Sequence, residues 1–431
     1  MLSLERREIA IPARRMTWPV SAPAHLWQLA LGWVLLIPTL YIAVDGVLIP
    51  RTGDVSFVAT GEDPGSSASH KVSLVLFGLT CLVLIALRFA PVLALGRRVK
   101  MLLAFPILAI LSFAWSVEPW QSVISGVVLL IFTLFAIYVG SRLTFQRQFE
   151  LIMLVGAVAL PVSIALAILV PSMGMDSTGW RGILVSKQNC SAVCTLWLIT
   201  ALHWKCSGIS QTIFRAIYIA MCALLIVMSQ SRTGWALALV ALLLSAAIWL
   251  LQRMPAKQSL AILLLGLAVA AVGLYGIYIY APKILTFVGK DATLSQRTTI
   301  WAAAWQAVLQ HPILGYGFAA FWRGLYGPSQ NLVLIAGWGL AQAQDGFLDV
   351  WLGIGLVGVV VIAVMAAQAM GNAFRCVFSE RNQAHVRWCI VVIVCTLLYN
   401  IGESSIGIVN IIWFFFLLAA TGVNQVSRER V

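Results

Sequence analysis

The side chains that could most clearly take part in chemistry are four cations that stand between apolar stretches. Arg232 lies in SQSRTGW, a polar break too short to form a domain, and Arg297 lies in SQRTTIW, near the start of an expected helix. Arg181 and Lys187 stand in GWRGILVSKQN. An arginine guanidinium can donate two parallel hydrogen bonds to phosphate oxygens while it stays charged. The four cations therefore predict a polyanion site, unless each one reaches lipid phosphates or pairs with a nearby acid such as Asp176.

The elements that must position these cations are long apolar segments. Hydrophobic residues make up 61% of the 431-residue chain and charged residues 10%, with a mean hydropathy of +0.95, whereas soluble domains carry about 25% charged residues. Many apolar runs are long enough to cross about 30 Å of hydrocarbon as a helix. They cover 26–44, 72–90, 101–117, 121–140, 151–170, 190–204, 212–228, 235–251, 259–281, 347–370, 388–401 and 408–422. We predict an all-α polytopic membrane protein with about twelve transmembrane helices.

The distribution of lysine and arginine predicts the orientation of these spans. Segments on the N-terminal side hold 19 basic residues and segments on the other side hold 9, which together are the 28 of the chain. Because cytoplasmic loops are enriched in lysine and arginine, both termini are expected in the cytoplasm. The net charge of +13 then serves topology and contact with anionic membrane lipids, and it requires no nucleic acid partner.

We expect a single membrane domain over 1–431, with one long periplasmic loop at 282–346 between the ninth and tenth spans. Short helices are expected inside this loop, which is rich in aromatic residues. Aromatic rings anchor at headgroup level, fill small cores and stack on sugar faces. Most of these rings are expected to anchor or to pack, and sugar contact is open to Trp322 and Trp338.

No pattern in the sequence indicates a metal ion or a cofactor. The eight cysteines fall within expected spans or on the cytoplasmic side, and the histidines show no metal-ligand spacing. A Walker loop, a Rossmann fingerprint and a nucleotide-sugar DxD pair do not occur near the motifs. The energy for any reaction would therefore have to come with the substrate.

Several motifs in a fixed order resemble those of one family of membrane proteins. The order is SRTGW, then SQRTTIW, then HPILGYGF, then AQDGFLD followed by GLVG. This order is similar to that of the O-antigen ligase and Wzy-type polymerase superfamily. GWRGILVSKQN also resembles a loop of its exopolysaccharide polymerase branch. The motifs cover about 181–360, and the expected topology extends the resemblance over most of the chain.

The resemblance implies a glycosyltransferase of the bacterial inner membrane with a site that faces the periplasm. Its donor would be a polyprenyl-pyrophosphate-linked oligosaccharide, and its acceptor a hydroxyl group of a second lipid-linked glycan. The activity would be the polymerisation of repeat units into exopolysaccharide, with no metal and no nucleotide. In this family the motif arginines bind the donor, so Arg232 and Arg297 are expected to bind the diphosphate, helped by Arg181 and Lys187.

The acceptor half of the motif set departs from the family pattern. Gln342 and Gln344 stand where the family has histidines, and Asp345 stands where it has asparagine. The second histidine is the family's proposed acceptor-activating base, whereas a glutamine amide does not titrate near neutral pH. Either Asp345 takes the proton, or Gln344 orients the acceptor hydroxyl in a late proton transfer, or the chain is inactive. Glu403, in LLYNIGESSIG, is a further candidate base or a partner for an arginine.

Other functions remain open from the sequence. Twelve spans also describe many transporters, which commonly consist of two repeated halves, but the two halves of this chain show no similarity. A lipid-linked oligosaccharide flippase would share the same ligand. An O-antigen ligase would use the same donor and transfer the glycan to lipid A core. For a polymerase, chain-length or export proteins are expected partners.

Overall fold

The computed structural model describes residues 38–42, 68–176, 178–254, 258, 297–325, 327–336, 340–378 and 383–428. Within these residues the chain is almost entirely helical, and the only β-type pairing is an isolated bridge between Met175 and Trp180. The expected all-α class is therefore confirmed for the described part of the chain. The expected spans 26–44, in large part, and 259–281 lie outside it.

Five helices are long and apolar enough to cross a membrane, judged by length and composition. They are α6 (Pro119–Arg142), α7 (Phe145–Leu169), α10 (Ile209–Met228), α11 (Arg232–Leu251) and α15 (Gly346–Cys376). A sixth crossing is counted if α3 (Ala68–Ala86) and α4 (Phe89–Arg98), which are bent by 93°, form one span. The protein is thus a multi-pass membrane protein, while the number twelve and the position of the termini stay predictions.

Four further apolar helices fill the remaining expected spans of the described residues. They are α5 (Lys100–Leu111), α9 (Lys187–His203), α16 (Gln383–Tyr399) and α17 (Ile411–Arg428). Helix α5 has 12 residues and is short for a full crossing, whereas α9, α16 and α17, with 17, 17 and 18 residues, reach only the lower limit of a span, because a helix rises about 1.5 Å per residue. Short apolar helices that are buried among others fit the centre of a bundle as well as a span.

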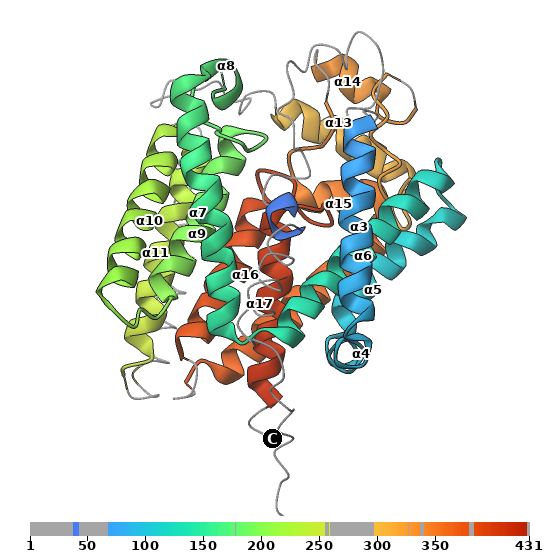
Figure 1. The fold of residues 1–431 in the computed structure, drawn as a ribbon. Coiled ribbons are helices and arrows are strands. Elements are labelled where there is room, and N and C mark those ends of the chain that lie inside the picture. Colours follow the sequence, from blue (N-terminus) through green and yellow to red (C-terminus); the bar gives the residue numbers. More distant parts are fainter. Residues whose placement is uncertain are drawn as a thin grey trace, which may run out of the picture.

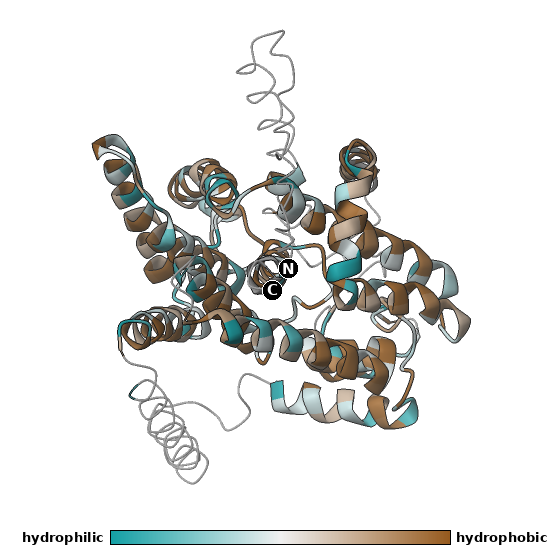
Figure 2. Ribbon diagram, turned by 90° about the horizontal axis from the view of Figure 1, so that it is seen from below, coloured by the Kyte–Doolittle hydropathy of each residue, from teal (hydrophilic) through white to brown (hydrophobic). Residues whose placement is uncertain are grey.

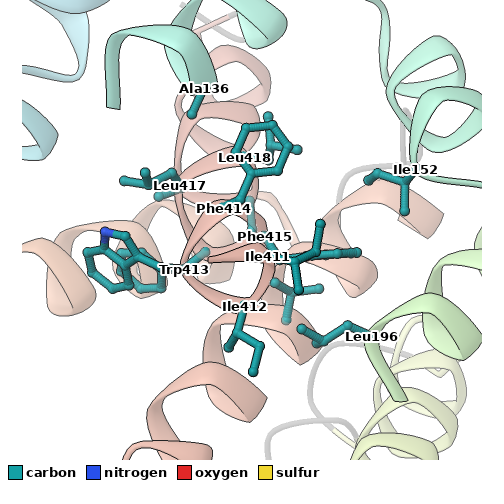
Figure 3. Close-up of a cluster of buried hydrophobic side chains, with 14 of the residues drawn as sticks. Ala136, Ile152, Leu196, Ile411, Ile412, Trp413, Phe414, Phe415, Leu417 and Leu418 are labelled. Atoms are coloured by element: carbon teal, nitrogen blue, oxygen red, sulfur yellow. The ribbon is translucent and has the colours of Figure 1, made fainter. Parts of the chain in front are cut away.

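Helix α17 forms the centre of the bundle. Its residues from Ile411 to Ala420 are all buried, including Trp413, Phe414 and Phe415. Figure 3 shows these side chains pointing in several directions around the helix, with Ile152 and Leu196 of neighbouring helices beside them. A helix that is apolar on every face and buried on every face lies in the core of a large bundle.

The outer faces of the bundle are apolar as well. Leu87, Ile209 and Leu243 are 72%, 75% and 61% exposed, and hydrophobic residues, drawn in brown, predominate along most of the helices in Figure 2. Exposed aliphatic surface of this extent is unfavourable in water and is the ordinary surface of a protein in lipid.

Several helices share one end of the bundle, which carries α13 (Arg297–Gln310) and α14 (Gln330–Ala336) and lies at the top of Figure 1. Helices α9, α11 and α15 begin there, and α10 and α16 end there. Helices α13 and α14 have their own small core, which includes Ile300, Val308 and Phe321. The end that α13 and α14 occupy is called the α13 end below.

Helix α15 is broken at Gly355, and the segment after α13 enters the break. Gly355 has φ 71° and ψ −167°, a conformation that is essentially confined to glycine. Tyr316 and Gly317 donate backbone hydrogen bonds to Leu352 and Gly353, at 2.8 Å each. A Cβ on Gly355 would lie 2.1 Å from the carbonyl oxygen of Ile313. The HPILGYGF and GLVG motifs are thus two sides of one backbone joint.

Candidate functional site

Arg297 and Glu403 form a largely buried ion pair at the α13 end, although they lie 106 positions apart in the chain. The Arg297 Nη2 atom lies 2.7 Å from Glu403 Oε1, and the two side chains are 19% and 9% exposed. Arg297 Nη1 also donates to the carbonyl oxygen of Gly402 at 2.6 Å. The first residue of α13 is therefore fixed to the turn that connects α16 with α17.

The side chain of Asn400 holds this turn together by hydrogen bonds. Its side-chain Oδ1 accepts hydrogen bonds from the backbone N–H groups of Ser405 and Ile406, and its Nδ2 donates to Thr396 and to the Ser405 hydroxyl. Asn400 is completely buried, and all of these bonds lie within the 396–406 segment. An asparagine that closes a local ring of backbone groups gives a short loop a defined shape.

The start of α15 docks on the same turn. Gly346 N–H donates to the carbonyl oxygens of Asn400, at 2.8 Å, and of Glu403, at 3.2 Å. A Cβ on Gly346 would lie 2.1 Å from Asn400 Oδ1, so this approach requires glycine. The segment of Gln344 and Asp345, just before Gly346, therefore leads onto the turn that carries Glu403.

Asp345 serves as the N-cap of α15, and Gln344 has an unusual backbone conformation. Asp345 Oδ1 accepts from the N–H groups of Phe347 and Leu348, at 2.9 and 3.0 Å, which is a common role for aspartate at a helix start. Gln344 has φ 55°, in the left-handed region that few residues other than glycine adopt. The direction of the half-buried Gln344 side chain is therefore set by a backbone conformation that costs free energy.

Asp349 ties three segments of the site together. Its carboxylate accepts hydrogen bonds from the backbone N–H of Ala343, at 2.9 and 3.2 Å, from Trp322 Nε1, at 2.8 Å, and from the Ser404 hydroxyl. Trp301 Nε1 donates to the carbonyl oxygen of the same Ala343 at 3.0 Å. The segment that leads into Gln344 is thus fixed from both sides, and Asp349 has a positioning role.

Arg232 is the first residue of α11, next to the same turn. Ser231 caps α11 and accepts from Gly234 N–H at 3.1 Å. A Cβ on Gly402 would lie 3.2 Å from Arg297 Nη1 and 3.9 Å from Thr233 Cγ2, so Thr233 and Arg297 flank Gly402. Arg232 itself is exposed. Among the residues that the structure describes, it has no hydrogen-bonding or ionic partner.

Arg181 lies in the loop before α9, and Lys187 is the first residue of α9. This loop lies beside α10, because Trp180 N–H donates to Met228 O at 2.9 Å. Arg181 Nε donates to Met173 O at 2.9 Å and lies 3.8 Å from Asp176 Oδ1. The Lys187 ammonium donates to the Thr178 hydroxyl, and Lys187 N–H donates to Asp176 Oδ2 at 2.8 Å. Both cations therefore have local partners, and Asp176 is the acid that the sequence offered as an alternative to a ligand.

Burial shifts the pKa of both candidate bases, Glu403 and Asp345, in the same direction. Burial raises the pKa of Glu403 above its ordinary value, and the opposing influence of Arg297 lowers it in part. Burial also raises the pKa of Asp345, against the effect of the N–H groups of Leu348 and Phe347. Each carboxyl group thus has a greater proton affinity than it would have in water.

Of the seven predicted site residues, Arg297 and Glu403 contact each other at the 400–403 turn. Arg232 and Asp345 directly precede Thr233 and Gly346, which adjoin this turn, and Gln344 precedes Asp345. Arg181, in a loop, and Lys187, the first residue of α9, lie beside α10, whose end approaches the start of α11. Sequence reasoning missed Asn400 and the connecting role of Asp349. The signal available for Asn400 was its position between an apolar run and the glycine of YNIGESS. Within the described residues no group of three potential metal ligands occurs.

Comparison with known proteins points to the same region of the chain. Residues 217–363 match the O-antigen ligase family model. The chain is also 30% identical to an O-antigen ligase of Pseudomonas aeruginosa over 192 residues, which are 44% of this chain and 42% of that protein. The resemblance to the O-antigen ligase superfamily is confirmed, and the aligned part spans less than half of the relative. The family match includes Arg232, Arg297, Gln344 and Asp345, whereas Glu403 lies beyond it.

Proposed function

We propose that this protein is a membrane glycosyltransferase of the bacterial inner membrane, which joins polyprenyl-pyrophosphate-linked oligosaccharide repeat units on the periplasmic face. The observation that carries this proposal is the contact of Arg297 with the 400–403 turn, on which Gly346 and Thr233 also rest. Stretches expected to bind a diphosphate donor thereby adjoin the stretch expected to bind an acceptor. The similarity to O-antigen ligases over 217–363 supports the same chemistry.

The donor half of the proposed site uses Arg232 and Arg297. As the bond to the sugar breaks, negative charge develops on the departing diphosphate, and fixed cations stabilise that charge. Arg232 is exposed beside the N-terminus of α11, and α9 also begins at this end, so two helix termini add partial positive charge. Arg181 would assist once the diphosphate competes with Asp176 for it, and Lys187 once its ammonium group leaves the Thr178 hydroxyl.

The acceptor half uses Glu403, Gln344 and Asp345. In the structure Arg297 neutralises Glu403 at 2.7 Å. A diphosphate that draws Arg297 onto its own oxygens removes this partner, and a buried carboxylate without a counter-charge binds a proton more tightly. Binding of the donor would therefore increase the basicity of Glu403 at the moment when the acceptor must lose its proton.

Gln344 and Asp345 receive supporting roles in this proposal. The Gln344 amide orients the acceptor hydroxyl, because it can accept and donate hydrogen bonds but cannot take a proton near neutral pH. Asp345 Oδ1 is engaged by the α15 cap, which leaves Oδ2 for the acceptor and makes Asp345 the alternative base.

The proposed step balances without a nucleotide. The acceptor hydroxyl oxygen forms a bond to the anomeric carbon, and the bond between that carbon and the pyrophosphate oxygen breaks. The bonding electron pair leaves with the polyprenyl pyrophosphate, which Arg232 and Arg297 bind. The hydroxyl proton passes to Glu403, and positioning of the two substrates supplies much of the rate gain.

Reconstitution tests the reaction. The purified protein in liposomes, supplied with lipid-linked repeat units and a chelator but no nucleotide, is expected to release polyprenyl pyrophosphate and to form longer glycans. Movement of the lipid-linked glycan across the bilayer without glycan growth would instead establish a flippase and refute the proposal.

Transfer to lipid A core is the second candidate function, because the matched relative is an O-antigen ligase. Liposomes that contain both a second repeat unit and lipid A core separate the two reactions. A polymerase forms repeat-unit ladders on the polyprenyl lipid, and a ligase places the glycan on lipid A core.

A further inference from the structure

A polar cluster lies at the opposite end of the bundle, where α9, α11 and α15 end and α16 begins. Arg387 Nε donates to His203 Nε2 at 2.9 Å, and Arg387 Nη1 donates to Gln252 Oε1 at 2.8 Å. Gln252 Nε2 in turn donates to the carbonyl oxygens of Val377, at 3.0 Å, and Gln383, at 3.3 Å. The guanidinium group of Arg387 is therefore fixed at a junction of four helices.

The partners of Arg387 leave its charge uncompensated. Because His203 Nε2 accepts a hydrogen bond from Arg387, its proton resides on Nδ1, which lies 2.8 Å from the carbonyl oxygen of Ile199, and the ring is neutral. Gln252 is neutral as well. Among the described residues no carboxylate lies within 4 Å of Arg387. Its Nη2 group has no partner within this part of the chain and remains available to donate.

Further cations stand next to Arg387. Arg253 follows Gln252 at the end of α11, and its guanidinium carbon lies 4.0 Å from the centre of the Trp249 ring. Arg253 is exposed, and it lies within electrostatic range of Arg387. A planar cation stacked on a tryptophan is typical of the level at which lipid headgroups meet protein.

Exposed apolar side chains flank the two arginines. Trp249 and Leu250 of α11 are 43% and 44% exposed, and Phe374 and Phe378, near Val377, are 52% and 50% exposed. Val377 is joined to Gln252 by a hydrogen bond. The cations and these apolar surfaces together offer a place for one charged headgroup and its acyl chains.

We infer that Arg387 and Arg253 form a binding site for the phosphate of an anionic phospholipid at the end of the bundle opposite the candidate active site. Arg387 Nη2 and Arg253 donate to the headgroup phosphate oxygens, and the acyl chains lie along Trp249, Leu250 and Phe378. The bound lipid compensates the half-buried charge of Arg387 at the junction of α9, α11, α15 and α16. This site is independent of the glycosyl transfer proposed above.

Lipid binding to the delipidated, full-length protein tests the inference. In native mass spectrometry we expect phosphatidylglycerol to bind at least about tenfold more tightly than phosphatidylcholine, which corresponds to about 1.4 kcal/mol. Arg253→Gln, at an exposed position, is expected to reduce phosphatidylglycerol binding about threefold or more, and Arg387→Gln more strongly. Thermal unfolding of each variant without lipid verifies that the protein is folded.

Arg147→Gln is the matched control, because Arg147 belongs to the first turn of α7 near the same end and already pairs with Glu150 at 2.7 Å. The control is expected to bind phosphatidylglycerol like the unmodified protein. Equal binding of the two lipids, or equal loss in Arg147→Gln and Arg253→Gln, would overturn the inference. Complete competition by millimolar inorganic phosphate would also overturn it, because the site would then bind free phosphate.

Discussion

At the scale of residues, the sequence offered candidate side chains, and the structure added the contacts that each of them makes. Arg232 and Arg297 stand out because basic residues on the side of the membrane opposite the cytoplasm have no topological use there. Arg297 proves to be paired with Glu403, a contact across more than 100 residues that no local pattern encodes. The connecting role of Asp349 was missed for the same reason, since its partners Trp322 and Ser404 come from separate segments.

Removal of the cation at Arg232 tests the donor half. Arg232→Gln is expected to lower kcat for glycan growth by about 10²–10³-fold, because a fixed charge on the developing anion is lost. The measurement is steady-state chain growth in liposomes. Arg323→Gln is the matched control, since Arg323 shares the α13 end but lies 3.7 Å from Glu118. Equal losses in both variants would indicate a general effect of charge rather than a donor contact.

The pH dependence of the reaction tests Glu403 as the base. A base must be deprotonated, and burial raises the pKa of Glu403 above its ordinary value of 4.5. Activity is therefore expected to rise with pH through a range above 4.5, which gives the pH–rate profile an acidic limb. Glu403→Gln should remove this limb and lower kcat by about 10²–10⁴-fold. Asp345→Asn should retain the limb. If Asp345→Asn removes it and Glu403→Gln does not, Asp345 is the base.

At the scale of elements, apolar length predicted helices well within the described residues. The break in α15 was not predicted, because GLVG continues an apolar run and only the docked segment after α13 explains Gly355. The HPILGYGF motif is accordingly a structural joint, and His311 at its start packs on Tyr316 with ring centres 4.5 Å apart. The same joint carries Asp345 and Asp349 on the first part of α15.

Glycine at the break is therefore expected to be essential for stability. Gly355→Ala should destabilise the protein by at least about 1–3 kcal/mol from its backbone conformation alone, with a further cost for moving Ile313 O away from the new Cβ. Gly371→Ala, in the same helix, is the control, because nothing lies within 4 Å of its Cβ position and alanine favours helix. Thermal unfolding in one detergent measures both. A Gly355→Ala protein as stable as Gly371→Ala would contradict the role of the joint.

At the scale of the whole molecule, hydropathy predicts the class of all-α membrane proteins, and the distribution of basic residues predicts the orientation of the helices in the membrane. The class is confirmed for the described residues, and the basic residues in the last turns of α4, α6 and α15 agree with a cytoplasmic end opposite α13. The tertiary arrangement could not be predicted, because an apolar helix buried at the centre, such as α17, has the same composition as one that faces lipid.

Cysteine labelling tests the orientation. On a Cys206→Ser background, Leu309→Cys on the exposed face of α13 should react with a membrane-impermeant maleimide in intact spheroplasts. Ser207→Cys, exposed in the loop between α9 and α10, should react only after permeabilisation. The reverse pattern would place the candidate site in the cytoplasm.

In the proposed mechanism, donor and acceptor groups form one site, and the bound diphosphate replaces Glu403 as the ionic partner of Arg297. Calorimetry of polyprenyl diphosphate binding in buffers of different ionisation enthalpy measures the protons taken up. We predict uptake of a fraction of a proton, up to about one, near the pKa of Glu403. Uptake should be absent in Glu403→Gln, which should still bind, and retained in Asp345→Asn. Binding with no proton uptake, or with uptake unchanged in Glu403→Gln, would contradict the claim.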